Sequence, residues 1–243
     1  MKNQAKIRIF VDNRLEEGLD VQIAEEASHY LCNVMRLKNG DKIICFNGTD
    51  GEFAAEIVNA NKKQTTLKII KLLRQPKPMP DIWLLFAPLK KDRTDFLIEK
   101  AVELGAARLV PVITDYAITD KIRADRIQAQ IIEAAEQCER LDIPELAPAI
   151  KLETLLNNWD CRRKLYFMDE RGQGRPCADA FEPQGSAALL IGPEGGFSDK
   201  EADILYKSKF VKPVSLGPRI LRAETAAAAA LAVWQAVAGD WKE

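Results

Sequence analysis

The sequence predicts an α/β protein made of a small β-rich region and a larger region with a mostly parallel sheet. Three observations lead to this prediction. Residues 6–70 contain short apolar runs separated by turn residues, which is typical of strands. Three prolines then fall within residues 76–80 and interrupt any regular element. From residue 82 onward, strand-like and helix-like segments alternate, as they do in parallel sheets covered by helices.

The first region has the strand and turn pattern of a small barrel. A hairpin signal, Asn47-Gly48-Thr49-Asp50-Gly51, separates two apolar runs. One short helix is predicted from Glu25 to about Met35. The predicted strands cover residues 7–11, 42–46, 53–58 and 65–70.

A domain boundary is predicted at the proline-rich segment, because three closely spaced prolines cannot continue a helix or a central strand. The resulting domains are residues 1–73 and residues 81–243. Residues 1–80 hold 13 Lys and Arg against 10 Asp and Glu, a formal charge of +3, whereas residues 81–243 hold 22 against 26, a charge of −4. The basic first region favours contact with a polyanion, with chance fluctuation as the alternative.

Helix ends are recognisable in the second region. Asp92 can cap a helix that runs to Leu104 and stops at Gly105. Ser198 and Glu201 have the spacing of a capping box. Apolar residues at positions 127, 131, 134, 138 and 141 form an amphipathic stripe, and residues 222–238 form an alanine-rich helix. The predicted strands cover residues 82–87, 108–113, 164–168, 187–192 and 211–216.

Composition argues against several classes of protein. No apolar run approaches the roughly 20 residues that span a bilayer, and the first ten residues contain no apolar leader segment. The five cysteines are scattered and form no CxxC pair, so no metal site is expected. Free thiols without an export signal favour the reducing cytoplasm.

Two loops rich in glycine and proline follow apolar strands, at residues 190–198 and 215–225. Because parallel sheets bind ligands at the carboxyl ends of their strands, such loops can hold a flat polar ligand such as adenosine through main-chain groups. The sequence lacks the P-loop, the dinucleotide-binding turn and the GxSxG motif. The only histidine, His29, lies in the other predicted domain, which argues against a Ser-His-Asp hydrolase.

These two loops, from Gly192 to Ser198 and from Leu216 to Ala226, resemble the ribosomal RNA small subunit methyltransferase E family of the SPOUT superfamily. Further similar segments lie at residues 29–36, 90–105 and 134–138, followed by Arg140, so that the resemblance covers nearly the whole chain. The sequence departs from the family at Lys91 and Glu139, where glycine is usual, and at Tyr116, near a common arginine.

The resemblance implies a small PUA-like β-barrel followed by a SPOUT α/β domain with a deep trefoil knot, in a homodimer. It also implies methyl transfer from S-adenosyl-L-methionine to N3 of a uridine in 16S rRNA of the small ribosomal subunit. Two alternatives remain open. One is a non-enzymatic RNA-binding or ribosome-assembly factor, and the other is the same chemistry on another RNA or base.

Site residues are assigned on the same basis. Arg222 and Glu224, at the start of the last helix, are the expected catalytic residues, with Glu224 expected to orient Arg222; an ordinary ion pair is the alternative. A Gly217→Val substitution is expected to crowd the second loop and abolish cofactor binding. RNA contacts are expected from Arg36, Lys90, Arg93, Gln137 and Arg140, and cofactor contacts from Met168, Ile191, Gly192, Gly195, Gly196, Leu216, Gly217, Pro218, Ile220, Leu221 and Thr225.

Overall fold

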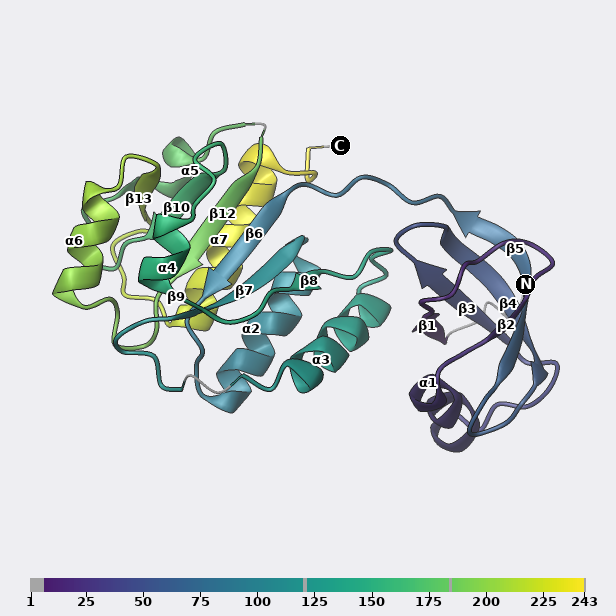
Figure 1. Ribbon diagram of the computed structural model, residues 1–243. Helices are drawn as coiled ribbons and strands as arrows, with labels where there is room; N and C mark the ends of the chain where they lie inside the picture. Colours follow the sequence, from purple (N-terminus) through teal and green to yellow (C-terminus); the bar gives the residue numbers. More distant parts are fainter. Residues whose placement is uncertain (1–6, 120–121, 184, 243) are drawn as a thin grey trace. The chain divides into compact units, whose positions relative to one another are not determined.

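A computed structural model describes residues 7–119, 122–183 and 185–242 (Figure 1). The chain separates into two compact units, and each is described by itself. The first unit comprises residues up to Pro78 together with Ala135–Ile143, and the second comprises Met79–Ala134 and the chain from Pro144 onward.

The first unit is built on a five-stranded sheet in the order β1-β3-β4-β5-β2. β1 runs parallel to β3, and the other pairs are antiparallel. The four predicted strands are confirmed with small shifts at their ends, whereas β2 was missed because it has only three residues. The predicted helix is a short α-helix continued by one π turn. The bounds are β1 Arg8–Phe10, β2 Asp20–Gln22, α1 Glu25–His29, η1 Tyr30–Val34, β3 Lys42–Asn47, β4 Gly51–Asn59 and β5 Thr66–Arg74.

A buried carboxylate holds the first unit together. Glu52, on β4, is 5% exposed and accepts hydrogen bonds from Arg8 Nε at 2.7 Å and from Arg74 Nε at 2.6 Å. The guanidinium of Arg8 also donates to the carbonyl oxygens of Ala135 at 2.8 Å and Arg140 at 2.6 Å. Arg74, which donates to the carbonyl of Glu139 at 2.9 Å, and the N–H of Phe10, which donates to Glu136 Oε1 at 2.9 Å, also tie residues 135–143 to the sheet of this unit.

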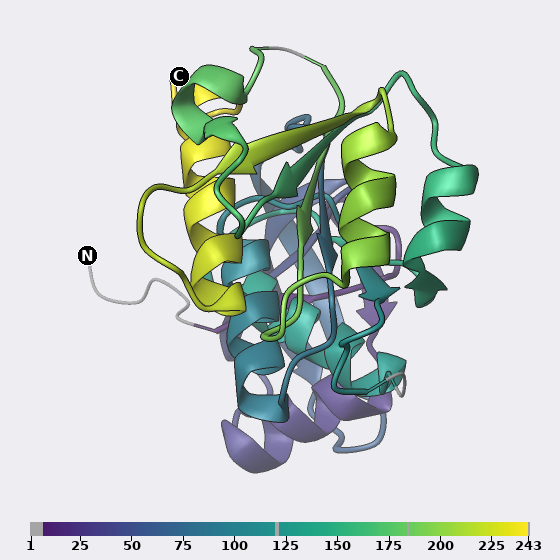
Figure 2. The ribbon, with the colours of Figure 1, turned by 90° about the vertical axis from the view of Figure 1, so that its left-hand side faces the viewer.

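The second unit contains an eight-stranded sheet in which every described strand pair is parallel. The order is β11-β13-β10-β12-β6-β7-β8, with β9 pairing β7 off this path. Figure 2 shows α2 and α7 on one face of the sheet and α4 and α6 on the other. The bounds are β6 Ile82–Phe86, α2 Lys91–Glu103, β7 Arg108–Ile113, α3 Ala124–Gln137, β8 Glu145–Leu146, β9 Ile150–Lys151, α4 Leu152–Asn157, β10 Lys164–Met168, β11 Arg175–Pro176, α5 Cys177–Ala180, β12 Ala187–Ile191, α6 Asp199–Lys207, β13 Val211–Ser215 and α7 Ala223–Ala238.

Sequence patterns located the main elements of this unit, with one error at a helix start. The five predicted strands are confirmed, and Ser198 and Glu201 form both hydrogen bonds of a capping box. The predicted cap at Asp92 is wrong, because α2 begins at Lys91, with Lys90 in the N-cap position and no side-chain cap. Asp92 instead lies in the first turn, where its charge still favours the positive end of the helix dipole.

Replacing Glu52 with Gln is expected to destabilise the first unit by about 3 kcal/mol, because it leaves two guanidinium groups without their shared charge. The expected value is at the low end for a buried pair since the side chain of Arg74 is 42% exposed. Glu16→Gln, which removes a pair exposed at both ends, is the matched control and should change stability by less than about 0.5 kcal/mol. Denaturant unfolding measures both, and equal losses of stability would contradict the stabilising role of Glu52.

The same carboxylate predicts a pH dependence. Burial raises the pKa of Glu52, but hydrogen bonds from Arg74 and Arg8 outweigh burial and hold the pKa below its ordinary value of 4.5. Because the folded-state pKa is lowered, the stabilisation is present above the unfolded-state pKa and is lost as pH falls through the folded-state pKa. The free energy of unfolding of the Glu52→Gln variant should therefore fall less than that of the wild type as the pH is lowered through this range. Denaturant unfolding at a series of pH values measures both, and parallel curves would contradict the role of Glu52.

Candidate active site

A cavity of about 200 Å³ lies at the carboxyl ends of β10 and β13. Its walls come from the loop after β10, from the loop after β13 and from α7, which contributes Ala226. Six of the predicted cofactor residues line it, namely Met168, Leu216, Gly217, Pro218, Ile220 and Leu221. Asp169 and Glu170, in the loop from Met168 that was also expected to close one side of the pocket, and Arg219, within the second predicted loop, line it too. Arg171, Gly172, Val214 and Ala226 were not predicted to line it.

The loop after β12 contacts the wall of this cavity through Phe197, and its residues Ile191, Gly192, Gly195 and Gly196 are not among the lining residues, so their contact with the cofactor stays a prediction. The N–H of Phe197 donates to Glu170 Oε1 at 3.2 Å, which joins the loop to the cavity wall. Gly196 has φ +72°, and a Cβ there would lie 2.6 Å from the same oxygen. Glycine is therefore required where the two loops meet.

Asp169 fixes the loop after β10. Its carboxylate is buried and accepts hydrogen bonds from the N–H groups of Arg171 at 3.0 Å and Gln173 at 2.8 Å, and from the Tyr206 hydroxyl at 2.8 Å. Burial, and then the hydrogen bond to Asp169, raise the pKa of Tyr206 to about 12. The hydroxyl consequently keeps its proton at neutral pH and remains a donor.

A charged cluster brings together residues from three elements of the second unit. Arg93, on α2, forms an ion pair with Glu194 of the loop after β12, and its Nε lies 3.9 Å from Glu224 Oε1 at the start of α7. Glu224 is 8% exposed, and its buried Oε2 has no hydrogen-bond partner among the described residues. A buried carboxylate oxygen without a donor favours a missing ligand or substrate group at this point.

Arg222 forms no ion pair with that cluster in the described part of the chain. It is the N-cap residue of α7, and its side chain is exposed. The expected pairing of Glu224 with Arg222 is therefore wrong for this structure, since the cation near Glu224 is Arg93. Arg93 was expected only as an RNA contact; its position in the first turn of α2, directly after a parallel strand, is the sequence signal that would have placed it at the ligand-binding edge of the sheet.

The crowding expected from a Gly217→Val substitution is wrong. A Cβ at this position would meet nothing within 4 Å, so a larger side chain would not crowd the loop. The constraint is the backbone itself, because φ is +105°, where a β-branched residue is strongly disfavoured. Thr225, also predicted to contact the cofactor, is exposed at the start of α7 and does not line the cavity.

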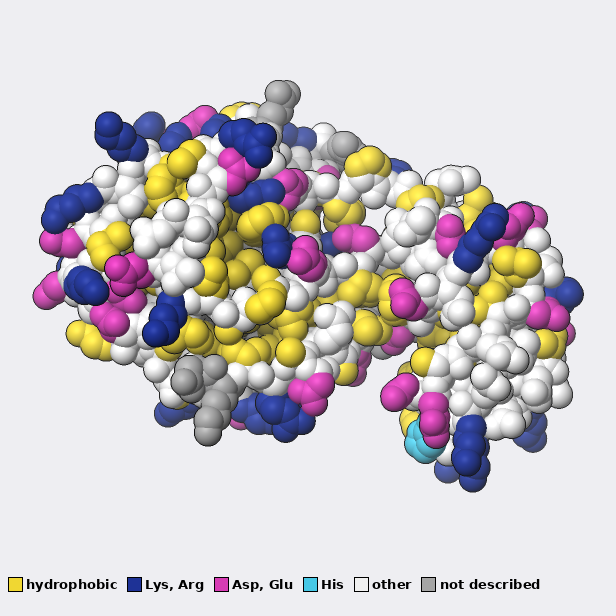
Figure 3. Space-filling model, in the orientation of Figure 1, with side chains coloured by type: hydrophobic (Ala, Val, Ile, Leu, Met, Phe, Trp, Pro, Cys, Tyr) yellow, Lys and Arg dark blue, Asp and Glu magenta, His cyan; other side chains and the backbone are white. Residues whose placement is uncertain are grey.

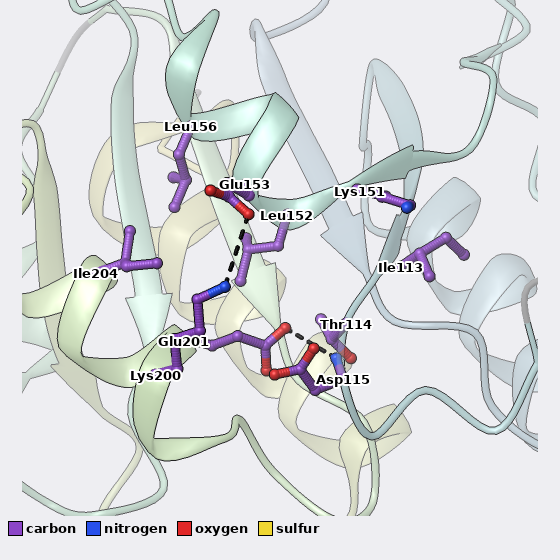
Figure 4. Close-up of a pocket in the computed structure, with 10 residues that line it drawn as sticks. All are labelled: Ile113, Thr114, Asp115, Lys151, Leu152, Glu153, Leu156, Lys200, Glu201 and Ile204. Carbon is purple, nitrogen blue, oxygen red and sulfur yellow. Dashed lines mark hydrogen bonds and ion pairs between the residues drawn. The ribbon is translucent and has the colours of Figure 1, made fainter.

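A second pocket, of about 250 Å³, lies beside the loop after β7 (Figure 4). A ring of hydrogen bonds closes one side of it: Ser198 Oγ donates to Asp115 at 2.6 Å, and the N–H of Asp115 donates to Glu201 at 2.9 Å. Lys200 reaches Glu153 across the pocket at 3.9 Å. This ring fixes the loop after β12 from the side opposite to Glu170.

Comparison with known proteins identifies the family. Residues 75–235 match the family model described as RNA methyltransferase domain, and residues 23–70 match the model described as RNA methyltransferase PUA domain. The chain is 34% identical to Ribosomal RNA small subunit methyltransferase E of Rickettsia conorii, with 93% of each chain covered. It is 28% identical to the protein of that name from Bacillus subtilis, with 90% of this chain and 92% of the relative covered. The chain belongs to the ribosomal RNA small subunit methyltransferase E family.

Solved structures agree with this family. A Ribosomal RNA small subunit methyltransferase E from Neisseria gonorrhoeae, bound to S-adenosyl methionine, aligns with a TM-score of 0.87 at 28% identity over 97% of this chain and 99% of that chain. A methyltransferase structure from Legionella pneumophila, in complex with the same cofactor, aligns with a TM-score of 0.86 at 32% identity over 98% of this chain and all of the other. The α/β fold with an N-terminal PUA unit is thereby confirmed.

The predicted RNA-binding residues of this family member differ in accessibility. Arg36, Lys90 and Gln137 are exposed. Arg140 is 8% exposed, and its guanidinium donates to both carboxylate oxygens of Asp142 at 2.9 and 2.7 Å. Its predicted RNA contact remains untested, but it could reach a phosphate only by leaving Asp142.

The described residues contain neither a candidate metal site nor a candidate membrane span. No group of three or more His, Cys, Asp or Glu side chains in the described ranges is arranged to hold a metal ion. None of the helices in the part of the chain that the structure describes has the length and apolar character needed to cross a membrane.

Ser198→Ala is expected to lower stability by about 1 kcal/mol, because it removes the side-chain cap of α6. Ser208→Ala, at the other end of the same helix, removes only a bond to the carbonyl of Ile204 and should cost less than about 0.5 kcal/mol. Chemical denaturation of the two variants tests the difference. Equal losses would mean that the hydrogen-bond ring around Ser198 adds nothing to stability.

Proposed function

We propose that this protein transfers a methyl group from S-adenosyl-L-methionine to N3 of a uridine in 16S rRNA of the small ribosomal subunit. The observation that carries the proposal is the buried, unpartnered Oε2 of Glu224, next to Arg93 and on the helix that follows the cavity-lining loop. Family membership supports the class of reaction, and two similar structures that hold the same cofactor support its identity.

The cavity fits this cofactor chemically. Leu216, Ile220 and Leu221 offer apolar contact to an adenine ring, and the loop backbone around Gly217 offers main-chain hydrogen bonds. Asp169 and Glu170 are balanced in the lining by Arg171 and Arg219, so the wall carries no net formal charge and the fit rests on its apolar and main-chain groups. S-adenosyl-L-methionine, when bound, supplies an electrophilic methyl group on a positively charged sulfur.

The main difficulty of the reaction is the proton on N3 of the uridine. This group titrates about two pH units above neutrality, so holding its anion at pH 7 costs roughly 3 kcal/mol at about 1.36 kcal/mol per unit. A fixed cation beside the uracil carbonyl oxygens offsets most of that cost, as donors do in an oxyanion hole. Arg222 is suited to this role because its guanidinium is exposed and follows the cavity loop directly.

Glu224 has a different role in the proposal from the one first expected. One of its oxygens lies near Arg93, while the other retains its acceptor capacity. That free oxygen is available to accept a hydrogen bond from the N3–H of the uracil through water. Because a carboxylate is a weak base for so weak an acid, Glu224 positions the base, and the N3 proton leaves to solvent water before N3 takes the methyl group and the sulfur departs as a neutral thioether.

RNA recognition and assembly follow from the same proposal. The unit that contains the PUA match, within the predicted domain of residues 1–73, docks on RNA through Arg36, while the predicted SPOUT domain of residues 81–243 carries the chemistry. Lys90, Arg93, Gln137 and Arg140 supply further contacts. We also infer a homodimer in the cytoplasm and a trefoil knot that involves α7 and the loop before it. A non-enzymatic RNA-binding factor remains the competing function, and cofactor binding separates the two.

Gly217→Val is expected to weaken S-adenosyl-L-methionine binding at least tenfold, because φ +105° strains a β-branched residue by about 1–3 kcal/mol and the loop will relax out of its binding shape. Gly18→Val is the matched control, since Gly18 has φ +88° and equally open surroundings in the first unit. Titration calorimetry measures both affinities. If the two variants bind the cofactor equally well, the cavity is not its site.

Arg222→Ala is expected to slow methyl transfer at least about a hundredfold at pH 7, the loss typical of removing one charge-stabilising donor. The rate should recover partly near pH 9, where the uridine ionises without help. Single-turnover rates on undermethylated small subunits, measured against pH for wild type, Arg222→Ala and Arg222→Lys, test this. An unchanged rate and profile in the alanine variant would remove Arg222 from the mechanism.

A further inference from the structure

A third pocket, of about 180 Å³, lies where the start of α2 meets the start of α3. Its floor is apolar and is formed by Pro88, Leu89, Ile122 and Ile127. The hydroxyl of Thr94 donates to the carbonyl of Leu89 at 3.0 Å and accepts from its N–H at 3.2 Å, so that part of the floor is fixed.

The rim of this pocket is positively charged. Lys91, Arg123 and Arg126 face a single lining carboxylate, Asp95, so the lining carries a formal charge of +2. Asp95 pairs with both Arg126 and Lys91. Outside the lining, Asp92 lies 4.0 Å from Lys91 and Asp125 pairs with Arg123; with these two carboxylates included the sum is zero, so the positive excess belongs to the lining itself. Figure 3 shows dark-blue side chains near the lower ends of α2 and α3, in a region of the chain that is acidic overall.

The lining of the pocket beside the loop after β7 has a formal charge of the opposite sign. Lys151 and Lys200 are outnumbered there by Asp115, Glu153 and Glu201, which gives a formal charge of −1. A phosphate is repelled by such a lining and attracted by the lining at α2 and α3. Of these two pockets, the one between α2 and α3 therefore suits a nucleotide.

The pocket lies on the same turn of α2 as the arginine of the candidate active site, Arg93. Lys91 and Asp95, one helical turn apart, face the pocket, whereas Arg93 lies between them in sequence and pairs with Glu194 near Glu224. The two sites thus occupy neighbouring sides of the same helical turn, within about 10 Å, the diameter of a helix. Neighbouring nucleotides of one RNA strand can bridge that separation.

We propose that this pocket binds an unpaired nucleotide of the substrate RNA that flanks the target uridine. The base lies on the apolar floor, and the phosphates on either side meet Lys91, Arg123 and Arg126, the arrangement by which proteins hold single-stranded RNA. The inference rests on the proposed function for the identity of the RNA. It adds a second subsite, which gives the enzyme contact with the strand beside the methylated position.

The first test reverses two exposed rim charges. Lys91→Glu and Arg123→Glu alter side chains that are 68% and 76% exposed, so the fold should be retained. Their matched controls are Lys207→Glu, which loses a comparable pair with Asp203, and Arg162→Glu, which like Arg123→Glu loses a pair two residues away. The probe is small subunits isolated from a strain that lacks this methyltransferase.

The expected result is a rise in KM for the subunit of about tenfold in each rim variant, with unchanged kcat and cofactor affinity. The dependence of binding on salt should also weaken by about one unit of slope for each reversed charge. The control variants should match the wild type. Rim variants that bind with the wild-type affinity and salt slope would overturn the proposal.

The second test asks whether a base enters the pocket. A photoreactive p-benzoylphenylalanine in place of Ile122 should cross-link to an unpaired nucleotide next to the methylated one, and the same probe in place of Ile204, in the pocket of opposite charge, should not. Cross-links only to distant or base-paired nucleotides would overturn the subsite. The proposed function fails separately, if wild-type protein transfers no methyl group to subunits that it nevertheless binds through the rim.

Discussion

The site depends on one constraint: the loops at the carboxyl edge of the parallel sheet have N–H groups that the sheet leaves unpaired. Carboxylates satisfy several of them; Asp169 and Glu201 are buried, whereas Glu170 is exposed. Asp169 accepts from Arg171 and Gln173, and Glu170 accepts from Phe197. A second set does the same after β7, where Glu201 accepts from Asp115 and from Ser198. Because Asp169 is held by Tyr206 of α6 and Glu201 lies on α6 itself, the loops keep one shape while their outer main-chain groups stay available to a ligand.

This way of holding the loops determines where glycine is needed. A side chain at Gly192 would lie 2.6 Å from the ring of Phe197, and one at Gly196 would lie equally close to Glu170. Gly192 thus allows close packing within its own loop, Gly217 provides a left-handed backbone conformation in open space, and both reasons apply at Gly196, whose φ is +72°. Glycine-rich loops that look alike in the sequence have different physical reasons, and a substitution acts through contact at Gly192 and through φ at Gly217.

Much of the fold could be predicted from the sequence, because alternating apolar strands, helix ends and a proline-rich boundary are local signals. Short elements such as β2, β8, β9 and β11 escaped prediction, since two or three residues carry no periodicity. The attachment of residues 135–143 to the first unit also has no local signal. It depends on residues far away in the sequence: Arg8, more than 120 residues away, donates to the carbonyl oxygens of Ala135 and Arg140, and Arg74 donates to that of Glu139. The same distance in sequence hid the pairing of Arg93 with Glu194 and Glu224.

The net charge of a region of the sequence is a poor guide to where that region binds its ligand. The first 80 residues carry +3 and suggested an RNA-binding region, but one of their arginines, Arg8, is neutralised by buried Glu52. The second region carries −4, yet a pocket in it is lined by three cations against one carboxylate. Since interactions between exposed charges are largely screened beyond roughly 10 Å in salt, an RNA strand responds to the local arrangement and not to the sum. A negatively charged unit can therefore hold RNA beside its active site, while its remaining acidic surface limits binding elsewhere on that unit.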